Sequence, residues 1–266
     1  MDRLVSATMT ADVLGPTTVE LQVAVAGPAP AEESLVATLD GRPAHLRELA
    51  APVGGRLHVL RCDRGHLEVT YRARVSGRAE PAVAEDLDPS VYLRPSRYAE
   101  SDRLAAVAAA ELGPRGTDPA RLLRDVAAWV GRRLAYAPGS SSGTDGAVDT
   151  LLAGAGVCRD FAHLATALLR SRDVPARLVS VYAPGLAPMD FHAVVEALVD
   201  DRWYVVDPTL LAPRRSLVRI ATGRDAADTA FMSSYGAGLR FGRLTVGATV
   251  EGDLPGEDLE DLVRIG

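Results

Sequence analysis

Hydrophobic side chains follow two different periods along this 266-residue chain. In segments 19–25, 57–62 and 66–75, apolar and polar residues alternate, which is typical of half-buried β-strands. From about residue 96, apolar residues recur every three or four positions, as they do on amphipathic helices, and strand-like segments follow after residue 175. The change of period predicts two differently built parts.

The first part has short strands separated by Gly and Pro, a spacing that predicts an antiparallel β-sandwich. Asp63-Arg64-Gly65 lies between two alternating segments and predicts a hairpin loop. In the second part, helices precede an antiparallel sheet. We therefore expect an α+β chain with an N-terminal β domain over residues 1–95, a second domain over 96–251, and an acidic tail over 252–266 that is solvated or only loosely docked.

Composition narrows the possible partners and compartment. The formal net charge is −6, which argues against a nucleic-acid or anionic-membrane partner. No run of about 18 apolar residues occurs, and the first residues lack a secretion signal, so we expect a cytoplasmic protein. Cys62 and Cys158 are far apart and belong to no metal-binding spacing, so neither a disulfide framework nor a metal or other cofactor is expected.

Cys158 is the first candidate for chemistry, because it follows Gly154-Ala155-Gly156-Val157 and opens a predicted helix. A thiol at a helix N-terminus faces free N–H groups and the positive end of the helix dipole, which favour the thiolate. The same N–H groups can stabilise an oxyanion. The alternative is that Cys158 is a small buried hydrophobe, as many free cysteines are.

A cysteine nucleophile needs a base and a residue that orients the base. His163 lies five positions along the helix, about 140° around its axis, and points away from Cys158. His45, His58 and His66 are expected on the surface of the β domain. His192, at the start of a predicted strand, is therefore the candidate base.

Asp207 is the candidate partner of His192. If Asp200-Asp201 is a two-residue loop, Asp207 lies diagonally across the hairpin from His192, within side-chain reach. A loop with an odd number of residues would place the two side chains on opposite faces. Asp207 alone could equally be a turn residue before Pro208.

Three sequence blocks resemble the bacterial transglutaminase-like superfamily. They are Gly156-Val157-Cys158-Arg159-Asp160-Phe161, Asp190-Phe191-His192-Ala193 and Trp203-Tyr204-Val205-Val206-Asp207-Pro208. Segments 92–96 and 223–228 are similar to flanking parts of the same architecture. The resemblance implies a papain-like fold, with helices packed on an antiparallel sheet, and a catalytic triad of Cys158, His192 and Asp207. The preceding β region is similar to the N-terminal domain of such proteins.

Val181 and Val194 depart from the family's usual sequence pattern, which has a glycine at the first position and an aromatic residue at the second. These departures affect the expected identity of the substrate more than the expected triad. Tyr136 and Tyr182 are candidates to lend hydroxyl groups to the cleft. Asp160 is a candidate to orient backbone beside the triad, or simply a first-turn charge on the helix. Segment 139–143 matches G-x-S-x-G but follows a helix, so we interpret it as a loop.

The expected function is acyl transfer through a thioester on Cys158. Hydrolysis of a peptide or amide substrate, possibly a protein, by a cysteine protease or amidase is our first hypothesis. Transfer of the acyl group to an amine, as in a transglutaminase, is the second. A non-catalytic scaffold that binds a protein partner is the third, and labelling of Cys158 distinguishes it from the other two.

Overall fold

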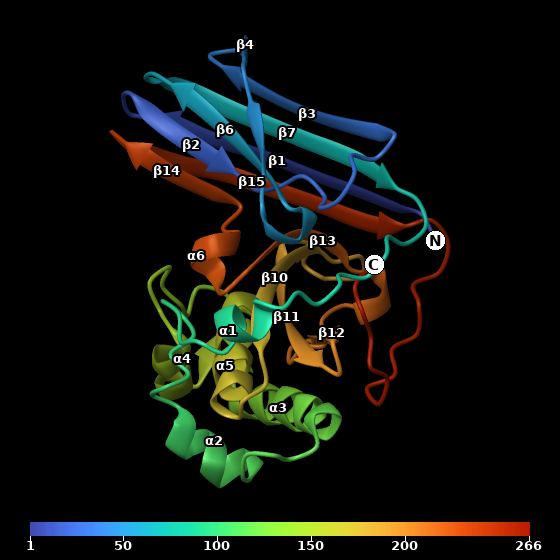
Figure 1. Ribbon diagram of the computed structural model, residues 1–266. Helices are drawn as coiled ribbons and strands as arrows, with labels where there is room; N and C mark the ends of the chain where they lie inside the picture. Colours follow the sequence, from blue (N-terminus) through green and yellow to red (C-terminus); the bar gives the residue numbers. More distant parts are fainter.

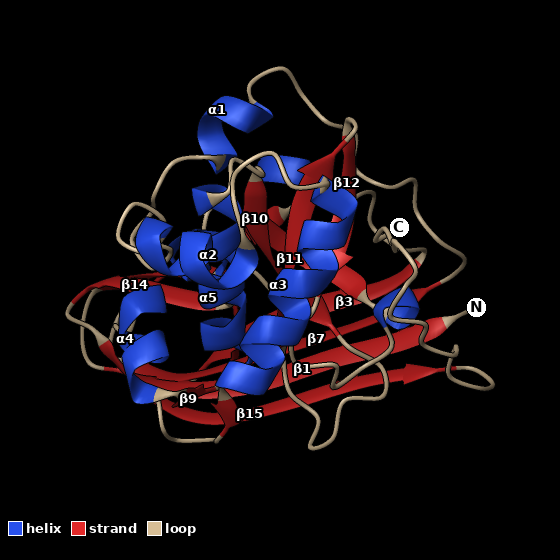
Figure 2. Cartoon of the chain, turned by 90° about the horizontal axis from the view of Figure 1, so that it is seen from below, coloured by secondary structure: helices blue, strands red, loops and turns tan.

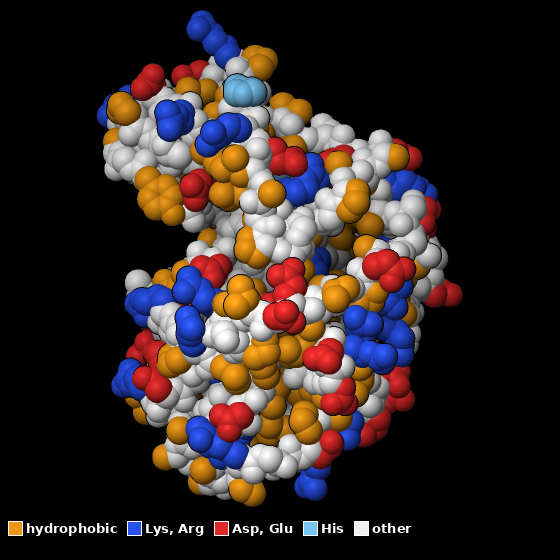
Figure 3. Space-filling view, in the orientation of Figure 1, with side chains coloured by type: hydrophobic (Ala, Val, Ile, Leu, Met, Phe, Trp, Pro, Cys, Tyr) orange, Lys and Arg blue, Asp and Glu red, His pale blue; other side chains and the backbone are white.

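A computed structural model describes residues 1–266 and confirms a mixed fold of mostly antiparallel sheets with a few helices. Figure 1 shows a β-sandwich above a layer of helices and strands. In Figure 3 a deep notch separates the two lobes on one side of the molecule. None of the helices has the length and apolar character needed to cross a bilayer.

The sandwich consists of two antiparallel sheets. One sheet has the order β15 (Leu239–Val250), β1 (Arg3–Val13), β7 (Gly65–Val75), β3 (Glu32–Leu39) and β4 (Arg42–Ala44). The other has the order β14 (Met232–Gly236), β2 (Thr17–Leu21), β6 (Arg56–Cys62) and β5 (Arg47–Ala50). Every second residue of β1 and β7 is buried, so the predicted alternation corresponds to one face on the core.

The predicted hairpin at Asp63-Arg64-Gly65 is wrong. β6 and β7 flank this segment but belong to different sheets, so the chain crosses from one sheet to the other there. β7 instead pairs with β1 and β3. Alternation defines the buried face of each strand but not its partner.

The predicted domain boundaries also need correction. Strand β7 ends at Val75, and residues 76–95 form a connecting segment with the short helix α1 (Asp88–Tyr92). At the other end, β14 and β15 pair with β2 and β1 of the N-terminal sandwich instead of joining the second sheet. The α+β layer is therefore inserted within the sandwich.

The α+β layer is built on a four-stranded antiparallel sheet. Its order is β12 (Arg202–Val206), β11 (His192–Val199), β10 (Ala176–Tyr182) and β13 (Val218–Gly223). Its helices are α2 (Ala105–Leu112), α3 (Pro119–Arg133), α4 (Ala147–Ala153), α5 (Cys158–Ser171) and α6 (Ala226–Thr229). In Figure 2 these helices lie on the near side, with the long strands of the sandwich behind them.

Helix α5 lies at the centre of this layer. Residues 160–171 are all buried, and the helix contacts β10, β11, α3 and α4. Two one-turn 3₁₀ segments, Pro52–Gly54 and Arg214–Ser216, and the short strands β8 (Ala135–Tyr136) and β9 (Ala155–Gly156) complete the fold. The two layers share a hydrophobic core to which Tyr182, Val218 and Ile220 contribute from the α+β side.

The acidic tail is not freely solvated. Val263 and Ile265 are only 2% and 4% exposed, and the Val205 N–H donates to the Val263 carbonyl. Ion pairs Arg214–Glu257 and Arg215–Asp261 hold the preceding part of the tail on the α+β layer. In the sequence, the apolar residues between the acidic residues of the tail indicated this docking.

Candidate active site

Cys158 is the first residue of α5 and is partly exposed. The backbone enters the helix through Val157, which has an extended conformation, and the Val157 N–H donates to Oδ2 of Asp160 at 2.8 Å. A Cβ on Gly156 would lie 2.7 Å from the Asp160 Cβ, so only glycine leaves room for this carboxylate. Asp160 thus orients the residue before Cys158, and it does so as a helix cap.

Tyr136 is brought next to this helix start. β8 and β9 form a short parallel pair with Tyr136 opposite Gly156, and the Ala137 N–H donates to the Gly156 carbonyl at 2.9 Å. Burial raises the pKa of Tyr136 to about 12, with a further contribution from the charge of Cys158. The Tyr136 side chain remains 42% exposed, so it borders the accessible side of the sulfur.

The loop over residues 139–143 is fastened to the residue after Cys158. Nη2 of Arg159 donates to Ser141 Oγ at 2.5 Å and to the Ser142 carbonyl at 2.7 Å. The loop lies between β8, which ends at Tyr136, and α4, which begins at Ala147, so none of its serines is at a sharp strand-to-helix turn and the interpretation as a loop is confirmed.

The β11–β12 hairpin has the predicted register. Val199 pairs with Arg202 and Val195 with Val206 across a two-residue loop. Asp200 and Asp201 have φ values of 48° and 58°, the left-handed conformation that a tight type I′ hairpin requires. His192 and Asp207 consequently lie on one face of the hairpin.

His192 and Asp207 form a buried hydrogen-bonded pair. Nε2 of His192 lies 2.8 Å from Oδ2 of Asp207, and both side chains are fully buried. The other carboxylate oxygen, Oδ1, accepts from the Thr209 N–H at 2.9 Å and from Thr209 Oγ1 at 2.7 Å. Asp207 is therefore held from both sides, and it holds the imidazole in turn.

Burial by itself would lower the pKa of His192, but the negative charge of Asp207 and its hydrogen bond raise that pKa to about 10. The converse holds for the carboxylate: burial opposes ionisation, whereas His192 and Thr209 lower the pKa of Asp207 below its usual value. His192 is therefore an imidazolium beside a carboxylate at neutral pH.

The sulfur and the imidazole are neighbours. Cys158 Sγ lies 4.0 Å from the carbonyl oxygen of Phe191, the residue before His192, and Cys158 is among the groups that raise the pKa of His192. Nδ1 of His192 is buried without a hydrogen-bond partner. This ring nitrogen is thus free to exchange a proton with the thiol.

Other predicted positions lie elsewhere. Tyr182 is wrong as a cleft residue: its ring is buried between the two layers, and its hydroxyl donates to the Val23 carbonyl at 2.8 Å. Val181 and Val194 are fully buried in a hydrophobic cluster, so they do not line an open cleft. His163 points away from Cys158 as predicted, stacks on Tyr98 and accepts from the Ala226 N–H. His58, expected on the surface, is buried beside Glu48.

Arg170 holds the two flanking segments, residues 92–96 and 223–228, in place. The sequence did not reveal this role. Its buried guanidinium donates to the carbonyl and hydroxyl oxygens of Arg94 and Ser96, and to the Arg224 carbonyl. One side chain on α5 thereby fixes both segments against the helix that begins with Cys158. In the sequence, this role was indicated only by a charged residue on the apolar side of a helix.

No group of three or more His, Cys, Asp or Glu side chains lies close enough together to hold a metal ion.

The fold and the sequence both define the class of protein. The Transglutaminase-like superfamily model matches residues 108–208. The crystal structure of the "Putative Cysteine Protease" from Cytophaga hutchinsonii is 31% identical to this chain with a TM-score of 0.86, and the match covers 99% of this chain and 96% of the other. The chain belongs to the transglutaminase-like superfamily.

Curated relatives are uncharacterized mycobacterial proteins. The one from Mycobacterium leprae is 30% identical over 150 residues, 52% of each chain. The one from Mycobacterium tuberculosis H37Rv is 35% identical over 123 residues, 40% of this chain and 39% of its own length. The chain thus spans about half or less of the length of these curated relatives.

Proposed function

We propose that the protein is a cysteine acyl-transfer enzyme that hydrolyses a peptide or amide bond through Cys158, His192 and Asp207. The observation that carries the proposal is the buried His192–Asp207 pair at 2.8 Å, next to a partly exposed thiol at a helix start. A purely structural cysteine needs neither a raised imidazole pKa nor a free Nδ1. Together these groups supply a nucleophile, a proton donor and an orienting carboxylate.

In the proposed reaction, the Cys158 thiolate attacks the substrate carbonyl carbon and forms a tetrahedral intermediate. The backbone N–H of Cys158, in the first turn of α5, stabilises the oxyanion because it has no acceptor within the helix. The C–N bond then breaks, the departing amine takes the proton from His192, and a thioester remains. Water attacks the thioester while His192 accepts a proton, which releases the acid and restores the thiolate.

Aromatic side chains near the thiol indicate where an acyl group would bind. Phe191 packs against Phe231, with ring centroids 5.3 Å apart, and Phe231 packs against Phe241 at 5.7 Å. Phe241 belongs to β15 of the sandwich and is 41% exposed. Because this row begins at the residue whose carbonyl contacts Sγ, it favours an apolar side chain on the substrate, as opposed to a charged one.

Iodoacetamide at pH 7 tests the nucleophile, and the chain contains its own control. Burial raises the pKa of the Cys62 thiol, so this thiol is expected to react slowly. We expect rapid, stoichiometric modification of Cys158, shown by peptide mass spectrometry, and little at Cys62. Equal, slow modification of both cysteines would overturn the proposal and leave the non-catalytic scaffold.

A library of peptides and γ-glutamyl amides, with and without a primary amine acceptor, tests the reaction. Hydrolysis predicts release of free acid that is lost in Cys158→Ala and kept in Cys62→Ala. Predominant formation of the new amide would instead identify the transglutaminase reaction. The cytoplasmic location stays a prediction from the sequence.

A further inference from the structure

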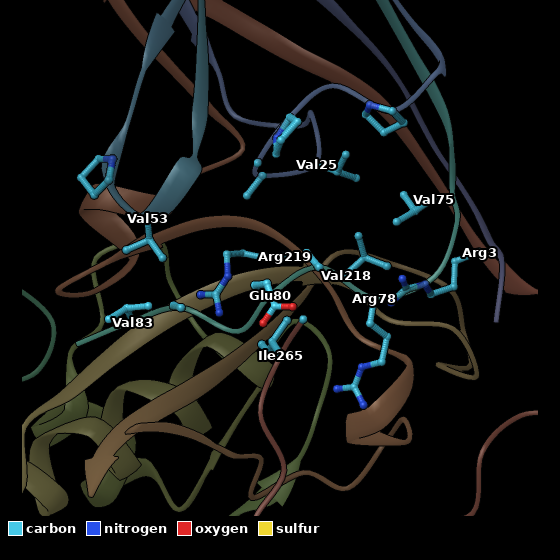
Figure 4. A pocket seen from close by; sticks show the side chains of 18 of the residues that line it. Arg3, Val25, Val53, Val75, Arg78, Glu80, Val83, Val218, Arg219 and Ile265 are labelled. Atoms are coloured by element: carbon cyan, nitrogen blue, oxygen red, sulfur yellow. The ribbon is translucent and has the colours of Figure 1, made fainter. Parts of the chain in front are cut away.

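A large cavity lies between the sandwich and the α+β layer, apart from the candidate active site. Its volume is about 730 Å³, within the range of about 300–1,000 Å³ that is usual for small-molecule sites. None of Cys158, His192 and Asp207 lines it. Figure 4 shows side chains from both layers pointing into it.

The lining of the cavity combines an aliphatic part with charged residues, and 11 of its 26 residues are hydrophobic. Side chains from the sandwich face others from β13 and from the docked tail across the space (Figure 4). The aliphatic lining includes Val25, Val53, Val75, Val83, Val218 and Ile265. A surface of this kind binds hydrocarbon in preference to a sugar or a nucleotide base.

Arg3 gives the cavity a buried positive charge without a compensating carboxylate. The residue is 1% exposed, its one hydrogen bond goes to the Gly77 carbonyl, and its Nε is buried without a partner. Arg78 lines the same end of the cavity, and one of its Nη donors is bonded to the Arg264 carbonyl at 2.6 Å. Burial, together with the charge of Arg78, lowers the pKa of Arg3. A buried guanidinium is costly unless an anion pairs with it, so this end of the cavity favours a negatively charged group.

The remaining charges limit the anion. Arg219 also lines the cavity but is already paired with Glu196, at 2.6 Å. Glu32, Glu80 and Glu85 line the cavity as exposed residues, and the partly exposed Asp88 lines it too. Acidic side chains at the exposed parts of the site repel polyanions, whereas a single negative charge held at Arg3 is neutralised.

We propose that this cavity binds a small aliphatic carboxylate, such as a medium-chain fatty acid, with its carboxylate on Arg3 and Arg78 and its hydrocarbon chain along the valine wall. Guanidinium groups bind carboxylates through paired N–H donors, and Arg3 has donors to spare. The site is separate from the acyl-transfer chemistry and does not depend on it.

Isothermal titration calorimetry of the full chain with sodium decanoate tests the proposal, with 1-decanol as the uncharged probe of equal chain length. We expect decanoate to bind and to raise the Tm, and decanol to bind at least tenfold more weakly. Arg78→Gln, an exposed position, should weaken decanoate binding about tenfold or more. The matched control, Arg72→Gln, changes an exposed arginine of β7 outside the cavity and should leave the Kd unchanged.

Arg3→Gln should remove binding while circular dichroism shows an intact fold; if that variant does not fold, Arg78→Gln and Arg72→Gln decide. Absence of decanoate binding at millimolar concentration would overturn the proposal. Equal affinity for decanol and decanoate, or equal weakening by Arg78→Gln and Arg72→Gln, would also overturn it.

Discussion

Replacement of Asp207 by asparagine tests the candidate triad directly. In the wild type, Oδ1 of Asp207 accepts two hydrogen bonds from Thr209, and Oδ2 faces Nε2 of His192. An asparagine has one carbonyl oxygen, and the two donors of Thr209 hold it on their side. Its NH₂ group then donates to Nε2, which must give up its proton, so the neutral tautomer with hydrogen on Nδ1 is favoured.

The size of the effect follows from the pKa of His192. With Asp207 present that pKa is about 10; without the carboxylate, burial lowers it to below the ordinary value of about 6.5. At pH 8.5 the imidazolium therefore falls from nearly all molecules to less than about 1%. The departing amine loses its proton donor, and in a serine protease the corresponding substitution lowers kcat about 10⁴-fold.

Two measurements check this prediction. NMR titration of the His192 imidazole should show the pKa move from near 10 to below 6.5. The rate of Cys158 alkylation by iodoacetamide at pH 7 should be lower in Asp207→Asn than in the wild type, because the His192 imidazolium beside the sulfur is lost.

Asp201→Asn is the matched control, since it lies in the turn of the same hairpin and its φ of 58° suits asparagine. An unchanged His192 titration in Asp207→Asn would refute the reasoning, and so would an equal change in Asp201→Asn.

Three further predictions concern stability. Gly156→Ala puts a Cβ 2.7 Å from that of Asp160, so we expect weaker capping of α5 and slower alkylation of Cys158; wild-type stability and rate would contradict this. Tyr182→Phe leaves the buried Val23 carbonyl unpaired and should lower the free energy of unfolding in urea by about 1–2 kcal/mol, with alkylation unchanged. Because the folded-state pKa of His192, about 10, exceeds the ordinary value of about 6.5, its stabilising contribution is complete below pH 6.5 and is lost as the pH rises through 10. The difference in unfolding free energy between wild type and His192→Gln should therefore shrink from pH 6.5 to 10, and a constant difference would refute it.

The sequence predicted the local geometry of the site well, because each part depends on neighbouring residues. The glycine-rich segment before Cys158 correctly predicted that this residue begins a helix. The two-residue loop correctly predicted the hairpin register that brings Asp207 next to His192. In each case short-range backbone geometry determines the result.

Long-range pairing could not be predicted in the same way. Alternation in β15 shows that one face is buried but says nothing of which strand is its neighbour, and that neighbour is β1, at the other end of the chain. Tyr182 was misplaced for the same reason, since a buried tyrosine hydroxyl needs an acceptor and the acceptor is a carbonyl of the distant sandwich. Arg3 gave no sequence signal, because its burial depends on two layers meeting.

The pairing of β1 with β15 has a consequence for synthesis. The first strand leaves the ribosome long before its neighbour exists, and until then one of its edges has unpaired N–H and C=O groups. A nascent chain released early would possess Cys158, His192 and Asp207 yet expose that edge to other chains. Completion of the sandwich therefore waits for the synthesis of β15, and a product that ends before this strand is expected to aggregate.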